Sequence, residues 1–212
     1  MTQTDELFDA ISDGNTQAVE QILDADPTLV AVPREGITPL RMAAYAGHPE
    51  LAEHLERRGA AADVFDAAAL GEVDQLRDLL DADADSVSAN AADGFTALHL
   101  AAWFGHPKVA ELLLARGADP QSVAANGTNL QPLHSAAAGG HIVIAHLLLD
   151  RGADIDAAQR GGITPLHSAA HRNDVEMVSL LLGRGADPAS ATDDGQTAAA
   201  LATDPAVLAL LP

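Results

Sequence analysis

The sequence predicts an all-α solenoid of stacked helix-turn-helix units rather than one globular core. The first observation is a period of 33 residues, which separates Leu133 from Leu166 and Thr164 from Thr197. The second is that each period holds start and stop signals for two helices. The third is that these helices have fewer than about ten residues, too few to persist alone in water. Each helix must therefore bury one face against the neighbouring unit.

Four copies of one block mark where the first helix of a unit begins: Gly36-Ile-Thr-Pro-Leu-Arg, Gly94-Phe-Thr-Ala-Leu-His, Leu130-Gln-Pro-Leu-His and Gly162-Ile-Thr-Pro-Leu-His. In the second copy Thr96 is suited to cap the helix N-terminus with its hydroxyl. Proline follows in the other copies. It has no backbone N–H, but the first turn of a helix does not need that donor. Gly105 is suited to end that helix, because glycine enters a left-handed conformation without penalty.

A second helix of the same unit is expected from His106-Pro107 to Leu114, followed by a turn at Arg116–Pro120. Alanine pairs recur in the first helices and allow neighbouring helices to approach closely: Ala43-Ala44, Ala101-Ala102, Ala136-Ala137 and Ala169-Ala170. Leucine pairs recur in the second helices and predict a continuous core: Leu113-Leu114, Leu148-Leu149 and Leu181-Leu182.

Three short motifs recur at this period: T-P-L-H at the start of the first helix, G-H between the two helices, as at Gly105-His106, and G-A-D in the turn after the second helix, as at Gly117-Ala118-Asp119. Together they resemble the ankyrin repeat family. The resemblance is strongest in Gly94–Asn126, Gly127–Arg160 and Gly161–Asp193 and covers nearly the whole chain at lower quality. It implies an all-α solenoid of about six to seven units including caps, with β-turn fingers at right angles to the helices. It also implies a concave face, made of finger tips and first helices, that binds other proteins.

We expect one array over residues 1–212, divided into an N-terminal cap repeat (1–35), a repeat (36–62), a finger-less repeat (63–93), three repeats (94–126, 127–160 and 161–193) and a C-terminal cap (194–212). The unit that begins at Val64 has almost no finger, because only about five residues separate Gly59 from Phe65. We expect a notch or kink in the rim there. A clean boundary between two sub-arrays at 59–64 is the alternative.

The net charge of −20 is uneven along the chain. Residues 1–93 hold 20 Asp and Glu against 5 Arg, a net charge of −15, whereas residues 94–212 hold 11 against 6 Lys and Arg, a net charge of −5. Such a field disfavours nucleic acid and anionic membranes and favours a partner with a basic surface. Solubility alone is the other explanation of the charge.

The chain contains no cysteine, which excludes disulfides and thiol chemistry. Its acidic N-terminus does not resemble a secretory signal, and no apolar run is long enough to span a membrane. We therefore expect a cytoplasmic monomer. There is no nucleophile or phosphate-binding motif, so we expect neither an enzyme nor a bound cofactor.

Histidines occupy the last position of the repeated block at His99, His134 and His167. There we expect each ring to bond local backbone and the threonine hydroxyl. His167 and His171 are four residues apart on one helix, a spacing that can hold a metal. Because no third ligand completes a motif, we expect no metal site. The alternative function is a metal- or small-molecule-responsive regulator that uses His134, His167 and His171.

Aromatic and basic residues fall on the positions that the resemblance makes variable and exposed. We expect the protein-binding residues to be Tyr45, Phe95, Trp103, Phe104, His171 and Arg172, with Arg34 and Arg160 on a polar rim. Exposed Trp, Tyr and Arg most often anchor interfaces. Local packing against a neighbouring finger is the other explanation of Trp103 and Phe104. The predicted function is a non-catalytic scaffold that binds a protein partner.

Overall fold

The computed structural model describes residues 2–211, which form seven successive helix pairs. The first helix of each pair is, in chain order, α1 (Gln3–Ser12), α3 (Pro39–Ala46), α5 (Val64–Leu70), α7 (Ala97–Phe104), α9 (Pro132–Gly139), α11 (Pro165–His171) and α13 (Ala198–Leu201). The second helix is α2 (Thr16–Ala25), α4 (Pro49–Arg57), α6 (Val73–Ala82), α8 (Pro107–Ala115), α10 (Ile142–Asp150), α12 (Val175–Gly183) and α14 (Pro205–Leu208). Two 3₁₀ turns, η1 (Pro27–Ala31) and η2 (Ala84–Ser88), follow α2 and α6.

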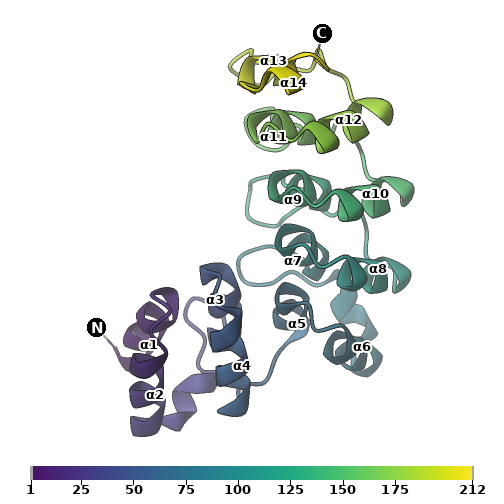
Figure 1. The fold of residues 1–212 in the computed structure, drawn as a ribbon. Coiled ribbons are helices and arrows are strands. Elements are labelled where there is room, and N and C mark those ends of the chain that lie inside the picture. The colour runs from purple at the N-terminus through teal and green to yellow at the C-terminus, as the bar shows by residue number, and fades with distance from the viewer. Residues whose placement is uncertain (1, 212) are drawn as a thin grey trace.

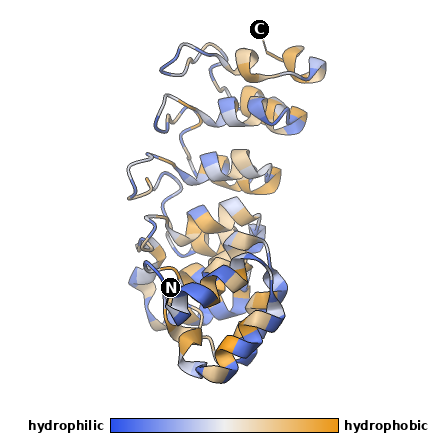
Figure 2. Cartoon of the chain, turned by 90° about the vertical axis from the view of Figure 1, so that its left-hand side faces the viewer, coloured by the Kyte–Doolittle hydropathy of each residue, from blue (hydrophilic) through white to orange (hydrophobic). Residues whose placement is uncertain are grey.

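From α7 to α12 the first helices lie in one column and the second helices in another, and α13 and α14 lie together at the C-terminal end of the stack (Figure 1). The loops between pairs project together to one side of the helices (Figure 2). Four of these loops close with a single antiparallel bridge: Arg34 with Ile37, Asn90 with Thr96, Gln159 with Ile163, and Ala191 with Thr197. The predicted all-α solenoid with β-turn fingers is therefore confirmed.

Helix ends follow the local signals of the sequence. Thr96 caps α7 by accepting a hydrogen bond from the His99 backbone N–H, and Gly105 ends the helix with a φ of 80°. The helix α8 begins at Pro107 as expected. At the N-terminus, α1 begins at Gln3, where Thr2 and Asp5 form a capping box.

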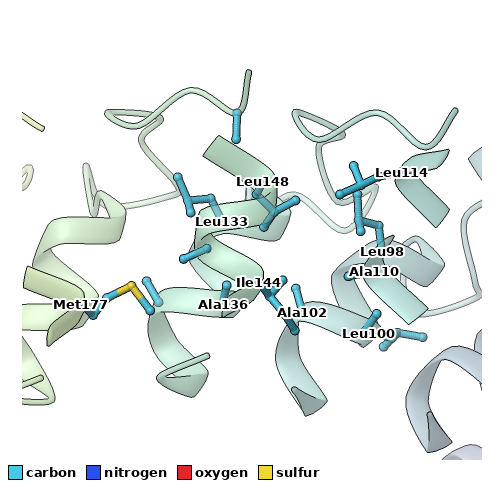
Figure 3. Close-up of a cluster of buried hydrophobic side chains, with 14 of the residues drawn as sticks. Leu98, Leu100, Ala102, Ala110, Leu114, Leu133, Ala136, Ile144, Leu148 and Met177 are labelled. Carbon is cyan, nitrogen blue, oxygen red and sulfur yellow. The ribbon is translucent and has the colours of Figure 1, made fainter. Parts of the chain in front are cut away.

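The core is a stack of small and branched apolar side chains between the two columns (Figure 3). Leu133 of α9 lies beside Leu148 of α10, and Leu98 of α7 lies beside Leu114 and Ala110 of α8 (Figure 3). Leu98, Leu133 and Leu148 are at most 1% exposed. Burial of a leucine or isoleucine side chain contributes about 1.5–3 kcal/mol. Because this layer repeats in every unit, the units stabilise one another.

The array turns sharply between α4 and α5 (Figure 1). The unit of α5 lacks a finger, and the fingers on either side of it close the gap: a Cβ on Gly36 would lie only 2.2 Å from Cβ of Ala92. The finger row therefore has no notch, and the chain bends at the missing finger instead. The buried apolar residues also divide here into two clusters, with Leu70 packed against both.

A buried ion cluster lies at this bend. The Arg41 guanidinium donates from Nε to Oδ1 of Asp66 at 3.1 Å and from Nη2 to Oδ2 of Asp63 at 2.7 Å. The Thr38 hydroxyl donates to the same Asp66 oxygen at 2.7 Å. Arg41 also lies over the ring of Phe65, 5.2 Å from its centroid. This cluster joins α3 to the N-terminus of α5.

Candidate functional site

Tyr45 on α3 reaches across the finger-less unit to the unit that follows it. Its ring stacks on Phe104 of α7, with centroids 5.8 Å apart and planes 25° apart. Its hydroxyl donates a hydrogen bond to Oδ2 of Asp93, in the finger before α7. Burial and the neighbouring Asp93 carboxylate raise the pKa of Tyr45, so the phenol stays neutral and donates. Tyr45 and Phe104 therefore pack on each other and also shape the surface beside them.

That surface contains a hollow of about 360 Å³ on the side of the molecule that carries the first helices and the fingers, which we name the finger-side face. Its lining residues come from α3, α7, α9 and two fingers: Tyr45, Phe95, His99, Leu100, Trp103, Leu130 and Ser135. Trp103 is 50% exposed and Tyr45 is 36% exposed. The expected residues Tyr45, Phe95 and Trp103 thus meet in one place, and large apolar surface remains open to solvent there.

His99 forms part of the wall of the hollow and is 1% exposed. Its Nε2 donates to the carbonyl of Leu130 at 3.0 Å, because a carbonyl oxygen can only accept. Its Nδ1 accepts from the backbone N–H of Thr96 at 3.3 Å. Burial lowers the pKa of His99 to about 4, so the ring is neutral at pH 7.

His171 and Arg172 lie apart from this hollow. His171 is exposed and lines a second, more polar hollow of about 380 Å³ between α11, α13 and two fingers. Arg172 is also exposed, and its guanidinium passes close to Gly140 of the preceding unit. The two residues therefore belong to a different part of the finger-side face.

The two rim arginines differ in their surroundings. Arg34 pairs with Asp9 of α1 at 3.2 Å and lies over the ring of Phe8, 4.6 Å from its centroid. The positive charge of Arg34 is therefore already paired within the chain. Arg160 is exposed at a finger tip, and its backbone N–H donates to the carbonyl of Thr128 at 2.7 Å.

Five residues of the site were not among the expected protein-binding residues: His99, Leu100, Leu130, Ser135 and Asp93. Asp93 accepts hydrogen bonds from two residues that line the hollow, Tyr45 and Phe95. Its position just before the repeated Gly-Phe-Thr block was the available signal. Its partner Tyr45 lies 48 residues earlier, and only the closed finger row brings them together.

Two of the three histidines proposed for the alternative, metal-responsive function, His134 and His167, are already bonded, whereas His171 is exposed. Nε2 of His134 bonds the Ile163 carbonyl at 3.2 Å, and Nε2 of His167 bonds the Gln196 carbonyl at 3.0 Å. Each Nδ1 accepts a backbone N–H, at 3.2 and 3.1 Å. Neither ring has a free lone pair, and within residues 2–211 no three metal-binding side chains come together. In the same residues no helix has the length and apolar character needed to cross a membrane.

Comparison with known proteins gives the chain its relatives. The family model for ankyrin repeats (3 copies) matches residues 7–124, 64–159 and 133–211. Ankyrin repeat and SAM domain-containing protein 6 of Mus musculus is 34% identical over 123 residues, which are 58% of this chain and 11% of the mouse protein. Ankyrin repeat and SOCS box protein 3 of Homo sapiens is 34% identical over 98 residues, 41% of this chain and 19% of the human protein.

The chain thus spans only a small part of these two relatives, and the similarity lies in the repeats. The matched segments of the family model together run from residue 7 to residue 211, across all seven helix pairs. The repeated block, the paired helices and the fingers agree with that match. The chain therefore belongs to the ankyrin repeat family.

Proposed function

We propose that the protein is a non-catalytic scaffold that binds a protein partner through the finger-side face, centred on the hollow beside Trp103. Ankyrin repeats are generally modules for protein–protein interaction, and their stacked units form extended binding surfaces. The observation that supports this site most is the half-exposed Trp103 at an open, largely apolar hollow. Buried aromatic anchors in such hollows supply most of the binding energy of protein interfaces.

The remaining expected residues take part at the edges of this interface. Arg160 at its finger tip and His171 beside the second hollow would contact the partner farther along the array, with Arg172 next to them. Arg34 would contribute least, because Asp9 and Phe8 already hold its guanidinium. Charged residues at an interface rim govern association rate more than affinity.

The partner surface is basic in this proposal. The net charge of −15 in residues 1–93 supports it, because that half supplies Tyr45 and Asp93 beside the hollow. Such a field accelerates the encounter with a basic protein, and the effect weakens as salt is added. We also propose that the protein is a monomer and that it is located in the cytoplasm.

The test compares two substitutions of exposed apolar residues on different faces. Trp103→Ala removes the anchor, and Val143→Ala changes a residue of α10 that is 55% exposed and outside the hollow. Partners captured from a lysate by the wild-type protein should be lost with Trp103→Ala and kept with Val143→Ala. Both variants should melt within a few degrees of the wild type. Equal capture by all three proteins would refute the site.

A further inference from the structure

We propose that the hollow receives an arginine side chain of the partner, whose guanidinium lies against Trp103 and pairs with Asp93. This inference rests on the proposed function, in which the finger-side face binds a protein. It adds the chemical class of the residue that is recognised. The argument depends on the aromatic lining, on one carboxylate and on the charges around them.

The lining of the hollow suits a cation with a flat, weakly hydrated surface. Tyr45, Phe95 and Trp103 contribute three aromatic rings to one hollow of about 360 Å³. The face of an aromatic ring attracts a cation, tryptophan most strongly, and the attraction grows as water is excluded. The half-exposed Trp103 leaves such a surface available.

Asp93 supplies a negative charge next to the hollow, because its carboxylate is bonded to two of the lining residues. One of its oxygens accepts the Tyr45 hydroxyl, and the other accepts the Phe95 backbone N–H at 3.2 Å. An ionised carboxylate can accept about four hydrogen bonds, so two remain for a ligand. Because both existing donors are neutral, the negative charge of Asp93 is not compensated by these bonds. The Tyr45 and Phe95 contacts also hold the carboxylate in place, which reduces the entropy lost on binding.

No cation on the neighbouring helices competes for this carboxylate. The Arg41 guanidinium is 1% exposed and is bonded to Asp66 and Asp63. His99 is neutral, because both ring nitrogens are bonded in a way that only the neutral ring allows. The hollow therefore combines apolar walls with an unbalanced negative charge.

Arginine fits this combination better than lysine or leucine does. A planar guanidinium stacks on an aromatic face while two of its N–H groups bond one carboxylate. An ammonium group is more strongly hydrated and loses more on entering apolar surroundings. A leucine would fill the hollow but would leave Asp93 desolvated without a partner, which is costly.

The test uses the full chain and single-residue probes, read out on Trp103, which is the only tryptophan. The probes are argininamide, lysinamide, the neutral arginine isostere citrullinamide, and leucinamide, at matched ionic strength. Each is titrated to roughly 50 mM, because ligands of this size bind in the millimolar range at best. Tryptophan emission and the indole N–H resonance report binding at the hollow.

Argininamide should bind. The affinity for citrullinamide should be lower by about fivefold or more, because citrullinamide lacks the charge-assisted bond. Asp93→Asn should weaken argininamide to the level of citrullinamide. Asp78→Asn removes the same charge from an exposed position on α6 and should change nothing.

Three results would overturn the inference: no response to argininamide, tighter binding of leucinamide, or unchanged argininamide affinity in Asp93→Asn. Tighter leucinamide binding would assign an apolar anchor to the hollow. The capture experiment with Trp103→Ala decides separately whether this face binds a protein. The arginine assignment can therefore fail while the proposed function stands.

Discussion

Arg41 on α3 and Asp66 on α5 form an ion pair that is sealed from solvent, with Nε and Oδ1 3.1 Å apart and side chains 1% and 0% exposed. Arg41 stands where three other units carry histidine. In those units the histidine Nε2 bonds a carbonyl in the finger of the next unit, at Leu130, Ile163 or Gln196. The unit after Arg41 has no finger and offers no such carbonyl. The longer guanidinium instead reaches the carboxylates at the start of α5.

Arg41→Ala should therefore cost about 3–5 kcal/mol in the free energy of unfolding, because it leaves the Asp66 carboxylate buried without its cation. Burial already raises the pKa of Asp66, and the loss of Arg41 should raise it further. Urea denaturation measures the cost. Acidification should restore part of it as Asp66 takes up a proton.

Arg116 provides the matched control for this substitution. It pairs with Asp81 at 2.8 Å, and the two side chains are 32% and 61% exposed. Exposed pairs contribute about 0–1 kcal/mol, so Arg116→Ala should change stability little. Similar costs for both alanine variants would show that the Arg41 cluster does not hold the bend together.

His99 should make the stability of the protein fall in mild acid. Burial lowers its pKa from 6.5 to about 4. Between these two pH values the ring is protonated in the unfolded chain but neutral in the folded chain. The stabilisation is complete above pH 6.5 and is lost as the pH falls to about 4. The difference of roughly 2.5 pKa units corresponds to about 3 kcal/mol.

His99→Gln tests this contribution. The glutamine amide cannot take up a proton, so the variant should be less stable than the wild type at neutral pH and should approach it as the pH is lowered. Burial also lowers the pKa values of His106 and His134, but both residues are present in both proteins. Their contributions to the pH dependence of stability therefore cancel in the comparison. Urea midpoints across this range give the comparison. A constant difference at every pH would contradict the role assigned to His99.

Gly105 and Gly47 end equivalent helices with similar left-handed φ angles, 80° and 76°. A Cβ at Gly105 would lie 2.4 Å from Cε1 of His141, whereas nothing lies within 4 Å at Gly47. Gly47→Ala should cost about 1 kcal/mol from backbone strain alone. Gly105→Ala should cost distinctly more.

The control for the glycine comparison is His141→Ala, which removes the imidazole that the new methyl group would meet. In that background the costs of Gly47→Ala and Gly105→Ala should become similar in thermal or urea denaturation. If Gly105→Ala stays more costly there, contact with His141 is not the reason. The same experiment measures how closely successive units pack at the helix turns.

The sequence predicted the features that depend on a few neighbouring residues. Thr96 caps the start of α7 and Gly105 ends it, as expected, because capping is a local interaction. The expected bond between His99 Nδ1 and Thr96 is also present. The second bond of that ring, to Leu130, depends on the position of the next finger and was missed.

The bend shows why the site was only partly predictable. The five-residue gap before Phe65 predicted a notch or kink in the rim, or alternatively a boundary, but it could not show that the flanking fingers would close up. That closure brings Tyr45 to Phe104 and Asp93, across 59 and 48 positions of sequence. Tyr45 and Trp103 were singled out by residue type and by their positions at the ends of first helices, which the family resemblance makes variable. Whether they bind a partner stays a prediction.

The most direct test of the account is a photo-crosslinking amino acid placed either at Trp103 or at Val143. The two positions are similarly exposed, 50% and 55%, but only the first lines the hollow. The account predicts a crosslinked partner protein from position 103 and none from position 143. Crosslinks from position 143 alone, or equally from both, would contradict recognition through the finger-side face.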